Sequence, residues 1–254
     1  MDTNLDLHPE MRQPRIGDAV GRVMGRCWDA GAAPWSAVEV IERDDGLIEA
    51  NDASRYFDAP ERWSDLERWG WEQATGRILD VGSGGGRHAV PWVELGRQVV
   101  GLEPSPEAVR VSRERGVETV VGEVPNLPEG LGMFDTIALF GNNLGLLGGP
   151  VQAPEILAAL ATVARPGARL IGKGMDPLYG AEAHAEYHAW NLSRGRARGQ
   201  LRIRMRDGDT ATPWFDYWFA TPDEIATAVA ESAWTLEVLE REPAGPGYVI
   251  CLRR

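Results

Sequence analysis

Apolar residues recur along this chain with two different periods, which predict helices and strands in succession. Between Ile16 and Trp28 they return every three or four residues, as in a helix that buries one face. Short apolar runs with the character of buried strands occupy 78–81, 98–102, 119–121, 134–140 and 168–172. Helical patterns separate these runs, so the chain is predicted to be an α/β protein with a mostly parallel sheet.

Outside these runs, three segments predict further strands. Asp45-Gly46 lies between two short strand-like runs and is typical of a hairpin turn. Residues 234–239 and 248–252 predict a closing pair of strands. Residues 201–206 alternate arginine with apolar residues, so the three arginines share one face of a strand. That face could hold an anionic substrate, or it could be a solvated face paired with acidic residues.

The apolar run at 78–81 breaks into a glycine-rich loop, Gly82 to Gly86, before a helix begins. Glycine suits such a turn because the backbone takes positive φ and a ligand can approach closely. The dinucleotide-binding pattern would require glycine where Arg87 stands. Asp80 places a carboxylate at the loop mouth, where it would repel a pyrophosphate and attract an ammonium group. S-adenosylmethionine carries an ammonium and a sulfonium, and this ligand is therefore favoured.

Two more polar positions follow the ends of predicted strands. Glu103 ends the second strand of the core, where a carboxylate can accept hydrogen bonds from both hydroxyls of a ribose. Asn142 and Asn143 follow the fourth strand, and ligands of open α/β sheets collect at this edge. Both amides could equally be turn residues that tolerate left-handed backbone. We favour a functional role, for Asn142 before Asn143.

Four motifs in order resemble the class I S-adenosylmethionine-dependent methyltransferase family, in its bacterial small-molecule branch. They are RILDVGSGGGRH at 77–88, VVGLEPSP at 99–106, MFDTIALFGNNLG at 133–145 and TPWFDY at 212–217. The resemblance implies a Rossmann-like sheet of seven mostly parallel strands, with helices on both faces and the last strand antiparallel. It also implies S-adenosylmethionine as cofactor and methyl transfer to a small-molecule acceptor.

The resemblance extends to individual site residues. It places Glu123 opposite the adenine amino group, Val124 against the adenine ring and Tyr56 nearest the substrate. The cofactor-binding residues predicted in total are Asp80, Gly82, Gly84, Gly86, Glu103, Glu123, Val124 and Phe140. The resemblance also suggests a division of the chain into a tail and cap over 1–72 and a methyltransferase-like domain over 73–254. An insertion of about 178–220, after the fifth strand, is expected to recognise the substrate.

The predicted catalytic residues are Asn142 and three residues of this insertion. His188 is the candidate general base, and it shares a helical face with His184. The two histidines could also bind a metal, but a third ligand is not evident, so no metal is expected. Asp216 and Tyr217 are expected to orient the substrate, because a carboxylate among aromatic residues needs a partner or a function.

The amino-acid composition limits the classes of partner that we expect for this protein. The net charge of −12 disfavours nucleic acid, whose binding depends on clustered cations. Cys27 and Cys251 form no disulfide or metal pattern, and neither a signal peptide nor an apolar run of membrane length is found, so we expect a cytoplasmic protein without a membrane partner. A homodimer or a hetero-partner is compatible with the apolar helix at the N-terminal end.

Two alternatives to methyl transfer stay open, because a fold does not fix a reaction. One is a non-methylating enzyme on the same fold, a lyase or ring-forming enzyme, for example in natural-product biosynthesis. The other is a non-catalytic subunit that acts through a partner. Release of S-adenosylhomocysteine would distinguish a methyltransferase from both.

Overall fold

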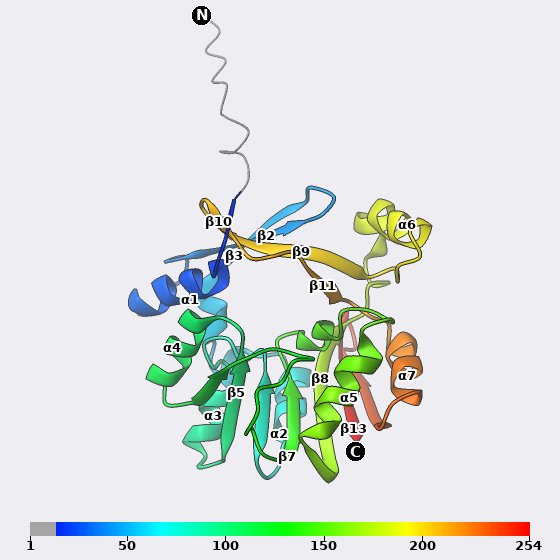
Figure 1. Cartoon of the computed structure of the whole chain (residues 1–254). Helices are drawn as coiled ribbons and strands as arrows, with labels where there is room; N and C mark the ends of the chain where they lie inside the picture. The colour runs from blue at the N-terminus through cyan, green and yellow to red at the C-terminus, as the bar shows by residue number, and fades with distance from the viewer. Residues whose placement is uncertain (1–13) are drawn as a thin grey trace, which may run out of the picture.

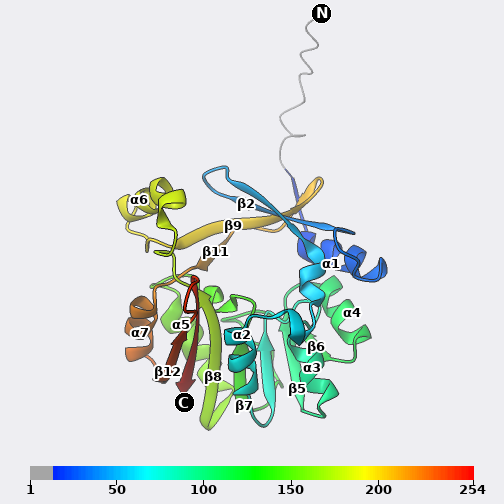
Figure 2. The same ribbon diagram turned by 180° about the vertical axis from the view of Figure 1, so that it is seen from behind.

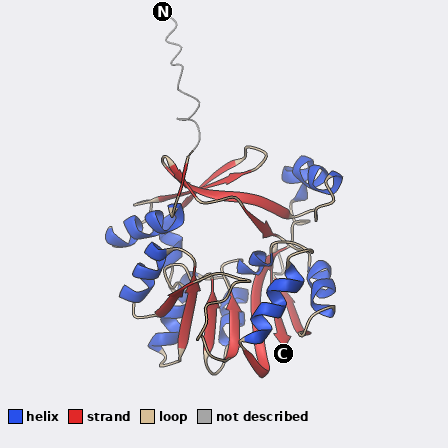
Figure 3. Cartoon of the chain, viewed as in Figure 1, coloured by secondary structure: helices blue, strands red, loops and turns tan. Residues whose placement is uncertain are grey.

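The computed structural model describes residues 14–254, which form two β-sheets that face each other (Figure 1). The predicted N-terminal tail lies almost entirely outside the described residues. A seven-stranded sheet is flanked by helices, and a six-stranded sheet lies across one end of it (Figure 3). In the described part of the chain, no helix has both the length and the apolar character needed to span a bilayer.

The seven-stranded sheet has the order β12-β13-β8-β7-β4-β5-β6. Its strands are β4 (Ile78–Val81), β5 (Val99–Glu103), β6 (Glu118–Val121), β7 (Phe134–Leu139), β8 (Ala164–Met175), β12 (Thr235–Arg241) and β13 (Gly247–Arg253). Strands β4 to β8 pair in parallel, whereas β13 runs antiparallel to both β8 and β12. The predicted Rossmann-like fold is therefore confirmed, including its antiparallel last strand.

Helices cover both faces of this sheet (Figure 2). They are α2 (Asp65–Glu72), α3 (Ala89–Glu94), α4 (Pro106–Glu114), α5 (Ala153–Thr162) and α7 (Pro222–Ala230). Trp71 of α2 stacks on Trp92 of α3 in the core on one face, at 5.3 Å between ring centroids. Leu157 of α5 and Ile225 of α7 are buried in the core on the other face. Burial on both faces explains why the parallel strands are continuous apolar runs in the sequence.

The six-stranded sheet, here called the cap sheet, joins two segments that are far apart in the chain. Its strands are β1 (Arg15–Ile16), β2 (Val38–Arg43), β3 (Ile48–Asp52), β9 (Gln200–Asp207), β10 (Thr210–Ala211) and β11 (Phe215–Trp218). The hairpin predicted from Asp45-Gly46 is formed by β2 and β3. β2 also pairs with β9 in antiparallel register, with Ile41 opposite Met205. The N-terminal segment and the insertion thus build one layer, a pairing that the sequence pattern did not predict.

One face of the cap sheet is charged. Arg204 and Arg206 of β9 contact Glu42 of β2 at 2.8 and 3.3 Å, and Arg202 contacts Asp216 of β11 at 3.4 Å. Of the two interpretations of the alternating arginines, the face paired with acidic residues is the one that the structure supports. The apolar residues of β9 consequently point to the opposite face, toward the seven-stranded sheet.

Helix α1 (Ala19–Asp29) holds the cap sheet against the core. Its N-cap, Asp18, accepts a hydrogen bond from the Gly21 amide at 2.9 Å. The same carboxylate accepts hydrogen bonds from the hydroxyl of Ser105 at 2.8 Å and the amide of Glu107 at 3.2 Å, both at the start of α4. The remaining helices are η2 (Ala53–Phe57), η3 (Pro60–Arg62), η4 (Asn143–Leu147), η5 (Ala181–His184) and α6 (Ala185–Ser193).

Candidate functional site

The glycine-rich loop lies at the carboxyl end of β4, on the side that the cap sheet covers. Gly82, Gly84 and Gly86 have φ values of +68°, +52° and +83°, which favour glycine. A Cβ atom at Gly84 would lie 3.2 Å from the methyl carbon of Met24 in α1, so the cap approaches the loop closely. The loop therefore meets the conformational requirement inferred from the sequence.

Three buried polar atoms near this loop have no hydrogen-bond partner among residues 14–254. They are Oδ2 of Asp80, Oγ of Ser83 and Oδ1 of Asn142. The Asp80 residue is only 2% exposed, and burial raises the pKa of its carboxyl to about 7, against a smaller lowering by the hydroxyl of Ser83, which lies close to it but outside hydrogen-bond geometry. Buried polar groups in folded proteins are nearly always paired, because an unpaired one has a free-energy cost of about 1–3 kcal/mol. Three at one loop indicate that a polar ligand binds there.

Glu103, at the end of β5, is the second buried carboxylate of the site. Its two oxygens accept hydrogen bonds from the Gly84 amide at 2.8 Å and the Ser105 amide at 3.0 Å. Burial is the main cause that raises the pKa of Glu103 to about 7. Each carboxylate oxygen can accept a second hydrogen bond, so Glu103 can hold the loop and still bind ligand hydroxyls.

The cap sheet contributes aromatic and acidic side chains to the same region. The hydroxyl of Tyr217 on β11 donates a hydrogen bond to the backbone carbonyl of Asn142 at 2.5 Å. Tyr56 of η2 donates its hydroxyl to the carboxylate of Glu39 on β2. A Cβ atom at Gly85 would lie 2.8 Å from the ring of Phe57, the neighbour of Tyr56 in η2, so η2 packs against the glycine-rich loop. The sequence alone did not single out Glu39, because it is one of several charged residues in a strand-like run.

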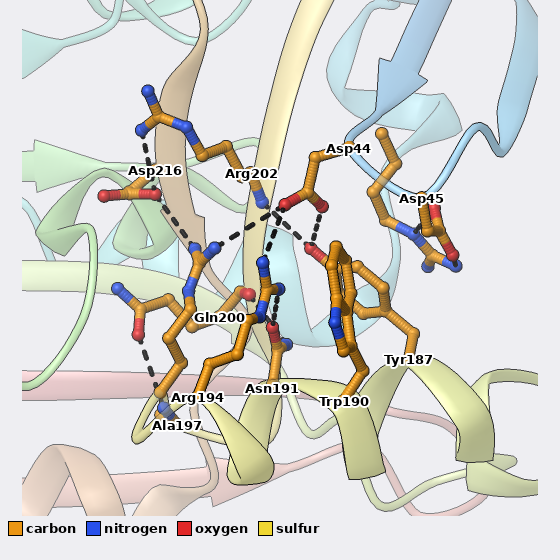
Figure 4. Close-up of polar contacts among 12 residues, drawn as sticks. Asp44, Asp45, Tyr187, Trp190, Asn191, Arg194, Ala197, Gln200, Arg202 and Asp216 are labelled. Carbon is orange, nitrogen blue, oxygen red and sulfur yellow. Dashed lines mark hydrogen bonds and ion pairs between the residues drawn. The ribbon is translucent and has the colours of Figure 1, made fainter.

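Asp216 and Tyr217 lie on opposite faces of the cap sheet. Adjacent residues of a strand point to opposite faces, so Tyr217 turns toward Asn142 while Asp216 turns away. The Asp216 carboxylate contacts Arg202 at 3.4 Å (Figure 4). It also contacts Arg196 at 2.9 Å and accepts a hydrogen bond from the amide of Gln152 at 3.1 Å. The carboxylate thus has an arginine pair as its partner, and a joint substrate-orienting role with Tyr217 stays a prediction.

His188, the predicted general base, lies on α6 at the edge of the cap, beyond the end of β9 (Figure 1). Its side chain is buried, and Nδ1 has no hydrogen-bond partner in the described chain. Its ring centroid is 6.2 Å from that of His184, and burial lowers its pKa. The helical spacing predicted both histidines on one helix, whereas in the structure His184 ends the 3-10 helix η5 and His188 lies on α6, which begins at Ala185. The spacing also could not give the direction in which α6 leaves the core. The catalytic role of His188 stays a prediction.

The other predicted cofactor contacts divide into surface and core positions. Glu123 is exposed in the loop after β6, and Val124 is half-buried and packs against the core. Phe140 is only 1% exposed, and its ring packs against His88 and Trp92 at 5.3 and 6.1 Å. The ring of Phe140 thus packs in the core beneath the site, and the contact of Phe140 with the cofactor stays a prediction.

A buried ionic cluster next to this aromatic core was also missed. One carboxylate oxygen of Glu67, on α2, accepts hydrogen bonds from Arg87 at 2.6 Å and from Nε2 of His88 at 2.7 Å. Its other oxygen contacts Lys173 at 2.9 Å. Burial opposes ionisation of Glu67, yet His88, Lys173 and Arg87 together hold its pKa well below the usual range. Lys173 is the single lysine in the sequence, the one signal that could have drawn attention to this cluster.

The chain was compared with known proteins on this basis. Residues 78–167 match a family model described as "Methyltransferase domain". A ubiquinone biosynthesis O-methyltransferase of Xanthomonas oryzae pv. oryzae is 32% identical over 133 residues, which cover 48% of this chain and 54% of that protein. A ribosomal protein L11 methyltransferase of Laribacter hongkongensis is 28% identical over 178 residues, which cover 66% of this chain and 56% of that protein.

Among solved structures, a SAM-dependent methyltransferase of Bacteroides fragilis in complex with S-adenosyl-L-homocysteine superposes with a TM-score of 0.76. The two share 23% sequence identity, and the match covers 92% of this chain and 94% of that chain. At this identity the similarity establishes the fold.

Residues 78–167 therefore match a methyltransferase domain, and the chain has the fold of an S-adenosylmethionine-dependent methyltransferase. The resemblance found in the four sequence motifs is thereby confirmed. The chain spans about half the length of the curated relatives it matches. The names of these relatives refer to ubiquinone biosynthesis in one case and to a ribosomal protein in the other, so similarity alone does not identify an acceptor.

Proposed function

We propose that this protein transfers the methyl group of S-adenosylmethionine to a small-molecule acceptor. The observation that carries the proposal is the set of three buried, unpartnered polar atoms of Asp80, Ser83 and Asn142 among the described residues. In a methyltransferase domain, such atoms around a glycine loop are explained by a polar ligand that the loop binds. A cytoplasmic location is part of this proposal, and it is supported by the free cysteines Cys27 and Cys251.

The residues of the site fit this ligand. Asp80 would hold its ammonium group, and Glu103 would accept hydrogen bonds from its ribose hydroxyls. Gly82, Gly84 and Gly86 would allow the ligand to approach the backbone, and we place its adenine near Glu123 and Val124. When bound, S-adenosylmethionine supplies a methyl group on a positively charged sulfur.

The cap sheet and the insertion of about 178–220 would supply the acceptor side of the site. Of the predicted catalytic residues, Asn142 and Tyr217 belong to this proposal, since they meet at the glycine loop. Their role is to position the acceptor and to exclude water, which accounts for much of the rate in transfer reactions of this kind. His188 and Asp216 are not needed for it.

Calorimetry with S-adenosylmethionine and with NAD tests the cofactor directly. We expect binding of the first and none of the second at equal concentration. Asp80→Asn should weaken S-adenosylmethionine binding at least tenfold, about 1.4 kcal/mol, because it removes the charge that faces the ammonium group. Asp209→Asn is the matched control, since Asp209 pairs with Arg15 on the exposed rim of the cap sheet. Unchanged binding by the Asp80 variant would contradict the proposal.

A second experiment separates the alternatives. The protein is incubated with S-adenosylmethionine and a panel of small acceptors, and release of S-adenosylhomocysteine is measured. Turnover of an acceptor without this release would favour a lyase or ring-forming enzyme. Cofactor binding without any turnover, together with a larger particle in light scattering when a second protein is added, would favour a non-catalytic subunit.

A further inference from the structure

The inner face of the cap sheet carries a carboxylate, that of Glu39, which forms no ion pair among the described residues; the charge of Arg55 lowers its pKa, but burial outweighs this effect. Glu39 of β2 accepts hydrogen bonds from the hydroxyl of Tyr56 and, at 3.3 Å, from the amide of Asn51. Both partners are neutral, and no arginine or lysine in residues 14–254 forms an ion pair with Glu39. Glu42 in the same strand, by contrast, is paired with two arginines on the outer face. The strand thus carries one neutralised and one unneutralised carboxylate, on opposite faces.

Glu39 lies on the same face of the cap sheet as Tyr217, because Ile41 pairs with Met205 and Tyr217 pairs with Leu201. It lines a small cavity between α1, β2 and β9 together with Tyr56, Met205 and Arg206, whose guanidinium is paired with Glu42. The charge of Glu39 contributes to raising the pKa of both Tyr56 and Tyr217, and the hydroxyl of Tyr217 contacts the Asn142 carbonyl. The carboxylate, two tyrosines and the unpartnered oxygen of Asn142 therefore lie around one region.

The chemistry of this group points to a cation. Burial raises the pKa of Glu39, so the ionised carboxylate is costly unless a positive charge approaches it. Tyrosine rings also attract ammonium groups through their faces, by about 0.5–2 kcal/mol. An anionic ligand would meet two buried carboxylates here, those of Asp80 and Glu103, and the half-buried carboxylate of Glu39.

We infer that Glu39, Tyr56 and Tyr217 form the acceptor-binding site of the cap, and that the acceptor carries a protonated amine. This inference rests on the proposed methyltransferase function and specifies its class of substrate. Glu39 forms the ion pair with the ammonium group of the acceptor, while the tyrosines pack against the carbon atoms next to it. Tyr56 is a positioning residue as well, because its hydroxyl fixes the carboxylate.

The test uses probes that differ only in charge. Tyramine, 4-ethylphenol and 4-hydroxyphenylacetate share one phenol ring and carry an ammonium, a neutral or a carboxylate group. Tryptamine, 3-ethylindole and indole-3-acetate form a second such series. Binding of each probe to the full chain saturated with S-adenosylhomocysteine is measured by calorimetry, so that turnover is not required. We expect the ammonium member to bind at least tenfold more tightly than the other two.

Two variants connect this preference to the site. Glu39→Gln should abolish the preference for the ammonium member while the affinity for S-adenosylhomocysteine stays unchanged. Glu49→Gln is the matched control, because Glu49 is an exposed acid of the paired strand β3 and tests the general negative potential. Tyr56→Phe should weaken the preference partially, since the carboxylate remains but loses its anchor.

The outcomes separate this inference from the function on which it depends. If S-adenosylhomocysteine binds but neither ammonium probe binds at millimolar concentration, or if neutral and anionic probes bind equally well, the inference is wrong and methyl transfer stands. Equal effects of the Glu39 and Glu49 variants would also overturn it. If S-adenosylhomocysteine and S-adenosylmethionine both fail to bind, the proposed function itself is wrong.

Discussion

At the scale of single residues, the two buried carboxylates of the glycine loop should make cofactor binding depend on pH. Without ligand, burial raises the pKa of both Asp80 and Glu103 to about 7. An ammonium group and ribose hydroxyls favour the ionised carboxylates, so binding S-adenosylmethionine must release protons near neutral pH. We expect its affinity to rise between about pH 6 and pH 8, as fewer protons have to be displaced.

Calorimetry in two buffers of different ionisation enthalpy measures this proton release. Asp80→Asn and Glu103→Gln should each reduce the number of protons released. An affinity that is constant over this pH range, with no proton release in the wild-type protein, would mean that the two carboxyl groups do not face the ligand.

Burial of His88 should make the stability of the folded protein fall as the pH falls. Burial is the main cause that lowers its pKa from 6.5 to about 4, so the folded protein keeps His88 neutral. As the pH falls from about 6.5 to about 4, the unfolded chain takes up a proton that the folded protein does not, and stability is lost. Asp80 and Glu103 have the opposite effect: because their pKa values are raised, the protein loses stability as the pH rises toward 7.

The contribution of His88 can be isolated by comparison with His88→Asn. The difference in the free energy of unfolding between wild type and variant, from urea denaturation, cancels the two carboxylates. This difference should shrink as the pH is lowered from 6.5 to 4. A difference independent of pH would show that His88 has the same pKa in the folded and unfolded protein, and a difference that grows as the pH falls would show that the folded protein keeps His88 protonated.

At the scale of elements, two glycines of α1 offer a matched pair of substitutions. In an isolated helix, Gly→Ala stabilises by about 1 kcal/mol. A Cβ atom at Gly21 would overlap the Ser105 hydroxyl and the Asp18 carboxylate, which together cap α1 and α4. A Cβ atom at Gly25 would meet only the carboxylate end of Glu107, which can move.

We therefore expect Gly21→Ala to destabilise the protein by about 1–3 kcal/mol and Gly25→Ala to be tolerated. Thermal unfolding of both variants checks the expectation. Equal effects of the two would mean that α1 does not pack on α4 through the Asp18 junction.

The ionic cluster of Glu67 ties three elements together, α2, α3 and β8, through contacts with Arg87, His88 and Lys173. Removing one partner of a buried ion pair costs about 3–5 kcal/mol, because the remaining charges are left uncompensated. Glu67→Gln should have a cost in this range in urea denaturation. Glu72→Gln, at an exposed position of the same helix, should have almost none.

At the scale of elements, local sequence patterns predicted strands but not how distant strands pair. The apolar runs and the Asp45-Gly46 turn were sufficient for the strands, because their residue patterns reflect burial on one or both faces of a sheet. The loop around Asp80 and Glu103 followed from strand ends, which meet at one edge of a parallel sheet. The pairing of β2 with β9 joins residues about 160 positions apart, as the contact of Arg204 with Glu42 shows, and no local pattern specifies it.

The positions of several predicted site residues depend on the same long-range contacts. Whether Asp216 faces the loop or the arginines depends on the register of β11 on β9, and the position of His188 depends on how the insertion leaves the core. Phe140 directly precedes the loop after β7, yet its ring packs back into the core. Glu39 became a candidate only when the cap sheet placed it on the same face as Tyr217, which contacts Asn142.

At the scale of the whole molecule, the cap sheet and the seven-stranded sheet meet the glycine loop from opposite sides. Tyr217 contacts Asn142 directly, and Asp18 links α1 to α4 next to Glu103. A ligand held by Asp80 and Glu103 should therefore stabilise the cap as well as the core. Saturating S-adenosylmethionine, at about 100 times its Kd, should stabilise the protein by about 2.7 kcal/mol.

Hydrogen exchange measured by mass spectrometry can locate this stabilisation. We expect slower exchange in the loops after β4, β5 and β7. We also expect it in β9 and β11, which belong to the cap sheet and not to the seven-stranded sheet. Tyr217→Phe removes the hydrogen bond to Asn142, so it should keep the protection of the loops and reduce that of β11. Protection confined to the loops in the wild-type protein would mean that the cap closes independently of the cofactor, and that only the acceptor brings the two sheets together.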